Sequence, residues 1–240
     1  MLYKTRGIFL HKINYSETSL IVHVFTEKFG LQSYLLKGAR RKKSRISANI
    51  LQHLALLNME VYYRESANLQ KIKEVSIDHH FQELPYDVRK SSIALFINEV
   101  LHKSIREQEA NTALFRFIEH AVIFLDNTTE RVVNFHLVFL IQLSRYLGFY
   151  PQQNYSEKHP YFDLLEGDFS EKMNHAYMLD ERQSKNFYTI INLTFETMSR
   201  VRFSHSEHSE ILGKLLEYYA LHLPGFGDIR SAGVLKTVFS

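Results

Sequence analysis

The sequence has no cysteine among its 240 residues. This absence excludes a disulfide-braced scaffold, a thiolate zinc ribbon, an iron–sulfur cluster and a cysteine nucleophile. It fits a reducing compartment, and a chain of this length can bury enough surface to need no cross-link or metal. Because 45% of the residues are hydrophobic and 13% are aromatic, the composition is that of a globular protein.

Long apolar runs are also missing. The run Leu137–Ile141 has five residues, and Gln142 ends it. A stretch of this length cannot cross a bilayer. The first ten residues, MLYKTRGIFL, have neither the apolar segment nor the small-residue cleavage site of a secretory signal. We therefore expect a cytoplasmic, nucleoid-associated protein with no membrane partner.

Catalytic signatures are missing too. The sequence has no G-x-x-x-x-G-K-[ST] phosphate loop and no G-x-S-x-G motif. The 13 histidines include no H-E-x-x-H motif, so we expect structural or surface histidines and no metal ligands. The acids Asp163, Glu166 and Asp168 fit a solvated turn better than the metal centre of a nuclease. The residues alone predict a binding protein that is not an enzyme.

Charge is unevenly distributed along the chain. Residues 1–80 hold 13 Lys and Arg against 6 Asp and Glu, a net charge of +7. Residues 81–240 hold 16 against 20, a net charge of −4. A basic first third joined to a mildly acidic remainder suggests that the first third meets a polyanion.

The first 80 residues have the pattern of short strands separated by turns. In residues 54–63, apolar side chains alternate with polar ones, as in a half-buried strand. The expected strands are Tyr3–Ile13, Ser19–Thr26, Leu31–Lys37, Leu54–Tyr63 and Leu69–Ile77. Five strands in this length predict a small β-barrel. The gap Gly38–His53 is too long for a hairpin and is the expected functional loop.

Helical spacing begins after Pro85. The expected helices are Asp87–Ile105, Asn111–Asp126, Arg131–Leu147, Glu181–Arg200 and one that follows the capping box at Ser204–Glu207. Residues 149–180 lack the helical spacing of apolar residues, and we expect them to form an irregular insertion. The predicted fold class is α+β, with a five-stranded barrel domain over residues 1–80 and a helical bundle domain over 81–240.

A cluster of cations lies within the expected functional loop. Six of the nine residues from Lys37 to Arg45 are basic, and no acid lies between Glu27 and Glu60. Such charges repel one another unless a phosphate backbone neutralises them and releases its counterions. The candidate DNA-binding residues are Lys12, Lys37, Arg40, Arg41, Lys42, Lys43 and Arg45. The aromatic residues Phe9, Tyr15, Phe25, Phe29, Tyr34, Tyr62 and Tyr63 could stack on bases, although we expect most of them in the core.

Several blocks of the chain resemble the RecO family of bacterial recombination mediators. They are Gly7–Leu10, Tyr15–Leu20, Phe25–Gly30, Lys37–Ser44, Leu51–Tyr63, Leu137–Pro151 with its Leu-Gly-Phe signature at 147–149, Arg230–Ser231 and Leu235. Their order and spacing span nearly the whole chain. The resemblance implies an OB-fold and a helical domain, binding of single- and double-stranded DNA, strand annealing, and no bond chemistry. It also implies work with RecR to help RecA load onto DNA coated by single-strand-binding protein (SSB).

The resemblance has one clear departure. Many members of that family carry a four-cysteine zinc site after the Leu-Gly-Phe signature, whereas residues 154–180 contain no cysteine. We therefore expect no zinc and no other cofactor. His159 and His175 could supply two nitrogen ligands at most, and we expect aromatic packing to brace this region instead.

Two partner questions stay open at this stage. The acidic, apolar tail of SSB requires an apolar slot with cations at its rim, and Arg116, Arg131 and Arg145 flank the apolar helices. Ordinary surface arginines explain the same pattern equally well. The alternative to DNA binding is a protein–protein adaptor whose basic loop binds an acidic partner.

Overall fold

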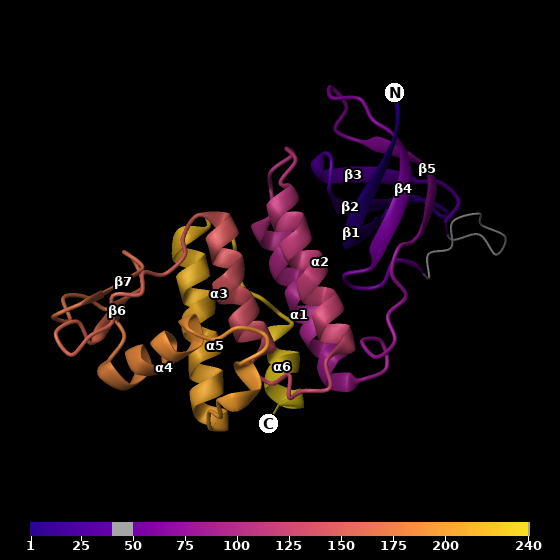
Figure 1. Ribbon diagram of the computed structural model, residues 1–240. Coiled ribbons are helices and arrows are strands. Elements are labelled where there is room, and N and C mark those ends of the chain that lie inside the picture. The colour runs from indigo at the N-terminus through magenta and orange to yellow at the C-terminus, as the bar shows by residue number, and fades with distance from the viewer. Residues whose placement is uncertain (40–49, 240) are drawn as a thin grey trace. The chain divides into compact units, whose positions relative to one another are not determined.

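The structure is a computed structural model that describes residues 1–39 and 50–239 (Figure 1). Its N-terminal strands are β1 (Leu2–Asn14), β2 (Leu20–Thr26), β3 (Gly30–Leu36), β4 (Leu56–Tyr62) and β5 (Gln70–Ile77). They close into a barrel in the order β1-β2-β3-β5-β4, in which only β3 and β5 pair in parallel. The predicted fold class, an OB-fold barrel followed by helices, is confirmed.

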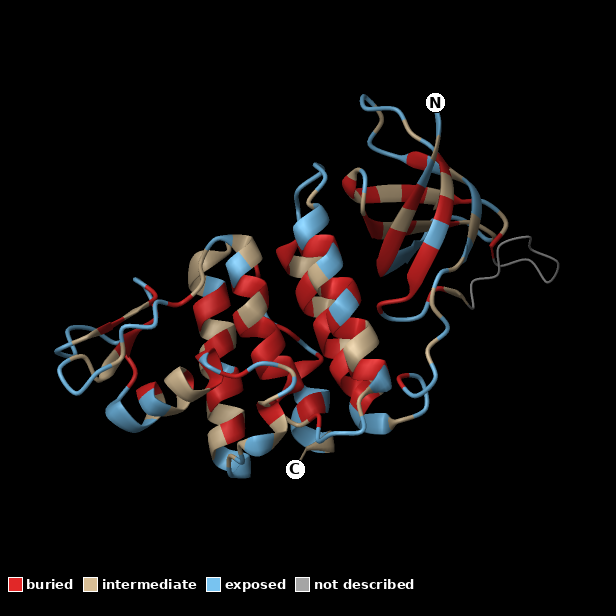
Figure 2. Cartoon of the chain, viewed as in Figure 1, coloured by how far each residue is buried: buried red, intermediate tan, exposed pale blue. Residues whose placement is uncertain are grey.

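Strand alternation gives the barrel its core. Buried and exposed positions alternate along the barrel strands (Figure 2). On β4, Leu57, Met59 and Val61 are buried while Asn58 and Tyr62 are exposed. The inward-facing residues of β1, β2 and β3 complete the cluster, which also contains Ala39, Leu51 and Ala55 from either side of the loop that joins β3 to β4. Both ends of that loop are therefore anchored in the barrel core.

The chain forms two compact units. One contains Met1–Tyr86 and Ile97–Asp126, and the other contains Asp87–Phe96 and Asn127–Ser240. Helix α1 (Val88–Ser104) contributes its first half to the second unit and its second half to the first, which also holds most of α2 (Thr112–Asn127). Over residues 1–39 and 50–239, every helix is too short or too polar to cross a bilayer.

Helix α2 packs on the barrel within the first unit. Phe115 of α2 lies 6.0 Å from Phe25 of β2, measured between ring centroids. The guanidinium of Arg6 on β1 lies over the Phe115 ring and donates hydrogen bonds to Glu27 and to Glu119 of α2. The Glu27 hydrogen bond, which outweighs desolvation, raises the pKa of Arg6 and lowers that of Glu27. This contact joins the β2–β3 turn, β1 and α2 by both apolar and charged groups.

The second unit is helical with one small hairpin. Its elements are α3 (Phe135–Leu147), β6 (Tyr161–Asp163), β7 (Asp168–Ser170), α4 (Glu181–Ile191), a 3₁₀ turn η2 (Met198–Arg200), α5 (His205–His222) and α6 (Ala232–Val238). Gly148 ends α3 in the left-handed conformation, with φ of 88°. Helix α3 is buried on nearly every side, as its sequence predicts, so it forms the centre of this unit.

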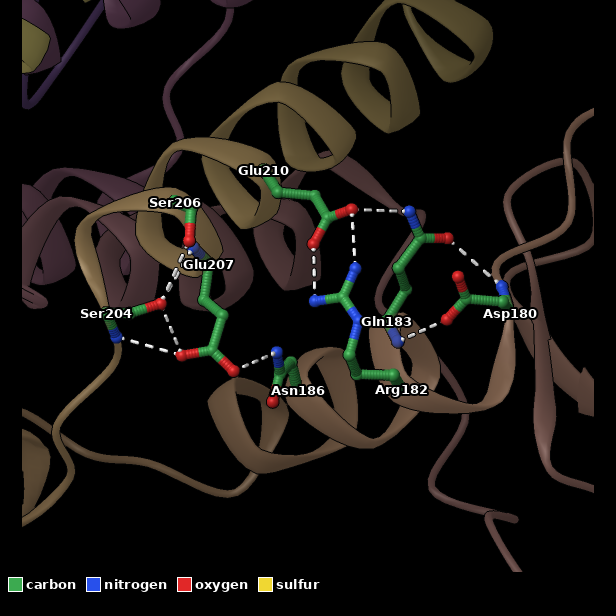
Figure 3. Close-up of polar contacts among 8 residues, drawn as sticks. All are labelled: Asp180, Arg182, Gln183, Asn186, Ser204, Ser206, Glu207 and Glu210. Carbon is green, nitrogen blue, oxygen red and sulfur yellow. Dashed lines mark hydrogen bonds and ion pairs between the residues drawn. The ribbon is translucent and has the colours of Figure 1, made fainter.

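The N-termini of α4 and α5 are joined by a polar network (Figure 3). Asp180 and Ser204 each close a capping box with the residue three positions later. Glu210 of α5 accepts hydrogen bonds from Arg182 and Gln183 of α4, at 2.9 Å and 2.7 Å. These bonds hold the pKa of the Glu210 carboxyl below its usual value. The network fixes how the two helices pack without a metal or a disulfide.

Two expected helix boundaries are wrong. Helix α3 begins at Phe135, not at Arg131, because residues 132–134 form a turn in which Phe135 N–H bonds to the Val132 carbonyl. Helix α4 ends at Ile191, not at Arg200, because Thr194 N–H turns to bond the Thr197 hydroxyl oxygen. At α3 a backbone turn bond satisfies the first amide, whereas after α4 a threonine side chain bonds the backbone and competes with the helix. The strands β6 and β7 and helix α6 have too few residues to give a periodic signal.

Candidate nucleic-acid interface

The basic cluster lies between β3 and β4 of the barrel. Arg40, Arg41, Lys42, Lys43 and Arg45 fall outside the described residues. Lys37 directly follows β3 and is exposed, and Lys12 is exposed on β1 opposite Val22 of β2. Neither lysine forms an ion pair with any residue in the described ranges. Both ammonium groups are therefore available to an anion.

A buried polar bridge holds the point where the chain returns to the barrel. Asn98 of α1 accepts a hydrogen bond from Leu54 N–H at 3.2 Å and donates one to the Leu10 carbonyl at 2.6 Å. Leu10 is the extra residue of a bulge in β1, so its carbonyl has no place in the ladder. Leu54 has φ of 61°, a strained value for a leucine. Asn98 thus pairs two backbone groups that the barrel leaves open.

The seven candidate stacking residues separate by burial. Phe9 and Tyr34 are buried in the barrel core, and Phe25 is buried on the side of β2 that faces α2. Phe29 and Tyr63 stack on each other with ring centroids 4.0 Å apart and are partly buried. Tyr15 and Tyr62 have 61% and 48% of their surface exposed. Of the seven, these two rings are the ones free to meet a base from the solvent side.

The three arginines proposed for an acidic tail belong to two compact units. Arg116 lies on α2 in the first unit, where its charge helps to lower the pKa of Glu27. Arg131 and Arg145 belong to the second unit, in which Arg131 precedes α3 and Arg145 lies in the last turn of this helix of about 20 Å. Arg145 lies 4.4 Å from the centre of the Tyr150 ring. The geometry therefore provides a cation beside an aromatic ring at Arg145 and an isolated exposed cation at Arg131.

Three histidines meet where α1 approaches the barrel. The ring centroid of His102 on α1 lies 4.4 Å from that of His11 on β1 and 5.6 Å from that of His23 on β2. His23 also bonds the Ser33 hydroxyl at 3.2 Å. Burial, with help from the neighbouring imidazoles, lowers the pKa of His102 to about 4. No spacing in the sequence signals this cluster, because it depends on strand register and on a helix some eighty residues away.

The cluster predicts a pH-dependent stability. A histidine whose pKa falls on folding stabilises the native state above about pH 6.5, and this stabilisation is lost as the pH falls toward 4 because the unfolded chain takes up the proton first. Replacement of His102 by Phe keeps a stacked ring and removes this proton. Between pH 7 and pH 5 we expect the variant to lose about 1 kcal/mol less stability than the native chain, since solvent screens the partly exposed ring.

Urea denaturation at the two pH values measures this difference. The charged neighbours Glu99 and Lys103, which pair with each other at 3.2 Å, are retained in the variant. His120→Phe at an exposed position of α2 is the matched control. Equal pH dependence in the His102→Phe variant and the native chain would show that the His102 proton has no influence on folding.

The insertion between α3 and α4 does not fit a metal site. His159 bonds the Ser156 hydroxyl, and His175 bonds the Asp163 carboxylate at 3.0 Å. Within the described ranges, no group of three or more His, Asp or Glu is arranged to hold a metal ion. Aromatic rings pack around the hairpin instead, with Phe162 4.9 Å from Phe169 and 4.5 Å from Phe187. These rings brace the β6–β7 hairpin against α4.

Comparison with known proteins identifies the family. Residues 1–81 match the family model described as Recombination protein O N terminal, and residues 85–228 match Recombination protein O C terminal. The chain is 38% identical to a protein of Phocaeicola vulgatus and to one of Bacteroides fragilis, and 41% identical to one of Flavobacterium psychrophilum. Each alignment covers 100% of both chains, and each relative is named DNA repair protein RecO. The chain therefore belongs to the RecO family.

Proposed function

We propose that this protein acts in DNA repair as a DNA-binding recombination mediator that performs no bond chemistry. The observation that carries the proposal is the run of six cations from Lys37 to Arg45, which is inserted between two strands of a closed barrel. The names of the relatives, all DNA repair protein RecO, support the same role. The substrates are single- and double-stranded DNA, held through their phosphates.

The mechanism needs no energy source. Two complementary strands repel each other through their phosphates, and pairing is downhill once they meet. Cations of the loop, together with Lys12 and Lys37, would neutralise phosphates, release counterions and raise the local concentration of strands. Strand annealing follows from this electrostatic effect alone.

The finer partners belong to the proposal. We include in the proposal that the protein works with RecR to help RecA load onto single strands coated by SSB. The SSB tail combines acidic and apolar groups, and Arg145 beside Tyr150 is a place where such a tail could find a cation and an aromatic ring together. Arg131 is a separate candidate, as is Arg116 on the other unit. We also propose that the protein uses no zinc and no other cofactor.

The salt dependence of DNA binding tests the proposal. We replace Arg40, Arg41, Lys42 and Lys43 by Gln and titrate labelled single-stranded DNA at several salt concentrations. If all four contact phosphates, the slope of log K against log salt becomes shallower by about 3, and affinity at low salt falls steeply. The matched control replaces four exposed lysines of the second unit, Lys158, Lys172, Lys185 and Lys236, by Gln, which changes the net charge equally.

Three outcomes would contradict the proposal. An unchanged slope in the loop variant would exclude the loop from DNA binding. Weak DNA affinity at physiological salt together with binding of an acidic protein would favour the adaptor. Strand cleavage on addition of magnesium or manganese would identify a nuclease.

A further inference from the structure

One outer face of the barrel exposes an aromatic ring among cations. Leu2 on β1 lies opposite Tyr62 on β4, which in turn lies opposite Lys71 on β5. Because side chains alternate along a strand, their neighbours Tyr3 and Val61 face the core. Leu2 is 46% exposed and Tyr62 is 48% exposed. The three residues form a row across three strands that faces solvent.

The apolar part of this face extends beyond the row. Met1 is 85% exposed, and Leu69, which precedes β5, is 37% exposed. Met1 is held in place because its amino group donates to the Tyr63 carbonyl and its carbonyl accepts from Tyr63 N–H. The Tyr62 ring makes no aromatic contact within the described ranges. We call Met1, Leu2, Tyr62, Leu69 and Lys71 the ledge.

Cations surround the ledge. Lys71 is exposed and forms no ion pair with any described residue. Lys4 and Lys73 share the Glu60 carboxylate at 3.5 Å and 2.8 Å, so one acid balances two cations. They line a hollow of about 770 Å³ that continues along the same face, where Lys28 is also found. The acids of this surface are Glu27, Glu60 and Glu74, and Glu27 is already paired with Arg6.

We propose that the ledge is a second DNA surface of the barrel, selective for unpaired bases. The inference rests on the proposed function and adds to it the strand form and the stacking residue. A base exposes its π-face to a tyrosine only when it is not stacked in a duplex, whereas phosphates are available in both forms. Tyr62 therefore binds a base, the apolar side chains of Leu2 and Leu69 support it, and Lys71, Lys4 and Lys73 attract the backbone.

The position of the ledge separates it from the basic loop. Leu36, the last residue of β3 before the loop, pairs with Leu20, and Leu20 pairs with Asn14 at the end of β1. Leu2 is the first residue of the same 13-residue strand. The ledge and the point where the chain leaves β3 for the loop thus lie toward opposite ends of β1, and the chain returns at Leu56, opposite Ile8. Two DNA-binding surfaces on one barrel suit a protein that must bring two strands together.

The exposed ring favours DNA over an acidic peptide as the occupant. Glu60 and Glu74 would repel the carboxylates of a peptide and the phosphates of DNA alike, but the nucleic-acid strand also offers bases whose π-faces stack on Tyr62. The apolar surface is also one open row rather than a closed slot. Binding of an acidic peptide at this face would therefore overturn the proposal.

The test compares single-stranded and duplex DNA of one sequence on the full chain. We expect Tyr62→Ala to weaken single-strand binding about tenfold, the effect of one lost stacking contact, and to leave duplex binding nearly unchanged. Tyr62→Phe keeps the ring and should bind as the native chain does. Tyr177→Ala, at another tyrosine with 42% exposure in the second unit, is the matched control.

Each result decides between explanations. If Tyr62→Ala binds single-stranded DNA as tightly as the native chain does, or loses affinity equally for both DNA forms, the proposed role of the ledge is overturned. The proposed function is then left intact. A native chain that binds neither form would overturn the proposed function itself, and binding of an acidic peptide that Tyr62→Ala abolishes would assign the ledge to a protein. If Tyr62→Ala lowers the melting temperature of the protein, Lys71→Gln tests the proposal instead. This variant should make the slope of log K against log salt for single-stranded DNA shallower by about 0.7. An unchanged slope overturns the proposal.

Discussion

Replacement of Gly30 by Ala is expected to destabilise the barrel unit by about 3 kcal/mol. Gly30 begins β3 with φ of 63°, a conformation that costs alanine about 1–2 kcal/mol. A Cβ atom there would also collide with the carbonyl oxygen of Glu109 and lie 2.7 Å from that of Glu107. Both obstacles are backbone, so they cannot rotate away. The change would push the segment after α1 off the barrel.

The residue that follows Gly30 joins the segment to the sheet. Leu31 N–H donates to the Glu107 carbonyl at 2.9 Å, and the Thr26 hydroxyl donates to the Gly30 carbonyl at 2.9 Å. Displacement of residues 107–109 would break the first of these bonds as well. Hydrogen exchange of peptides from β2 and β3, combined with urea denaturation, locates and measures the effect.

Two other glycines give matched controls. Gly148 has φ of 88° but nothing within 4 Å of a Cβ atom, so Gly148→Ala isolates the conformational cost at about 1 kcal/mol. Gly213, inside α5, also has open space, and Gly213→Ala should stabilise by about 0.5–1 kcal/mol because alanine favours helix. If Gly30→Ala is at least as stable as Gly148→Ala, residues 107–109 move aside at little energetic cost.

The turn at Gly30 illustrates what the sequence can predict. Local chemistry is sufficient there, because a glycine between two runs of β-branched and aromatic residues marks a hairpin turn. The same reasoning gives the five strands within one or two residues, the cap at Asn111, whose side chain accepts from Leu114 N–H, and the stop at Gly148. Each of these features is encoded within a few residues of where it occurs.

Features that depend on distant pairing could not be predicted in the same way. The row of Leu2, Tyr62 and Lys71 exists because of strand register, which assigns Tyr62 to the outer face and Tyr63 to the inner one. In the sequence, Tyr62 is one of seven candidate stacking residues of equal standing. The cation cluster, by contrast, was visible from composition alone, because charge density is a local property and needs no pairing to recognise.

Asn98 shows most clearly why distance in the sequence hides a structural requirement. It lies 44 residues from Leu54 and 88 residues from Leu10, and its two hydrogen bonds link α1 to the bulge of β1 and to the strained Leu54 before β4. In the sequence, this polar residue only interrupts the helical spacing of apolar residues. In the structure only 5% of it is exposed, and it pairs one buried donor with one buried acceptor.

Asn98→Ala is therefore expected to cost about 3–4 kcal/mol, because it leaves the Leu54 amide and the Leu10 carbonyl buried without partners, each at about 1–3 kcal/mol, and opens a small cavity. Leu54 would then lose the hydrogen bond that offsets its strained φ of 61°, so exchange of amides in residues 51–55 should rise more than exchange in β2. The matched control is Asn58→Ala, which removes an exposed hydrogen bond to Asp78 and should cost less than about 0.5 kcal/mol. Urea denaturation and hydrogen exchange measure both variants. If the two substitutions cost the same, water or a shifted backbone replaces the bridge, and the return of the chain after the basic loop is held by apolar packing of Leu51 and Ala55 and by the bond from Phe9 N–H to the Ala55 carbonyl.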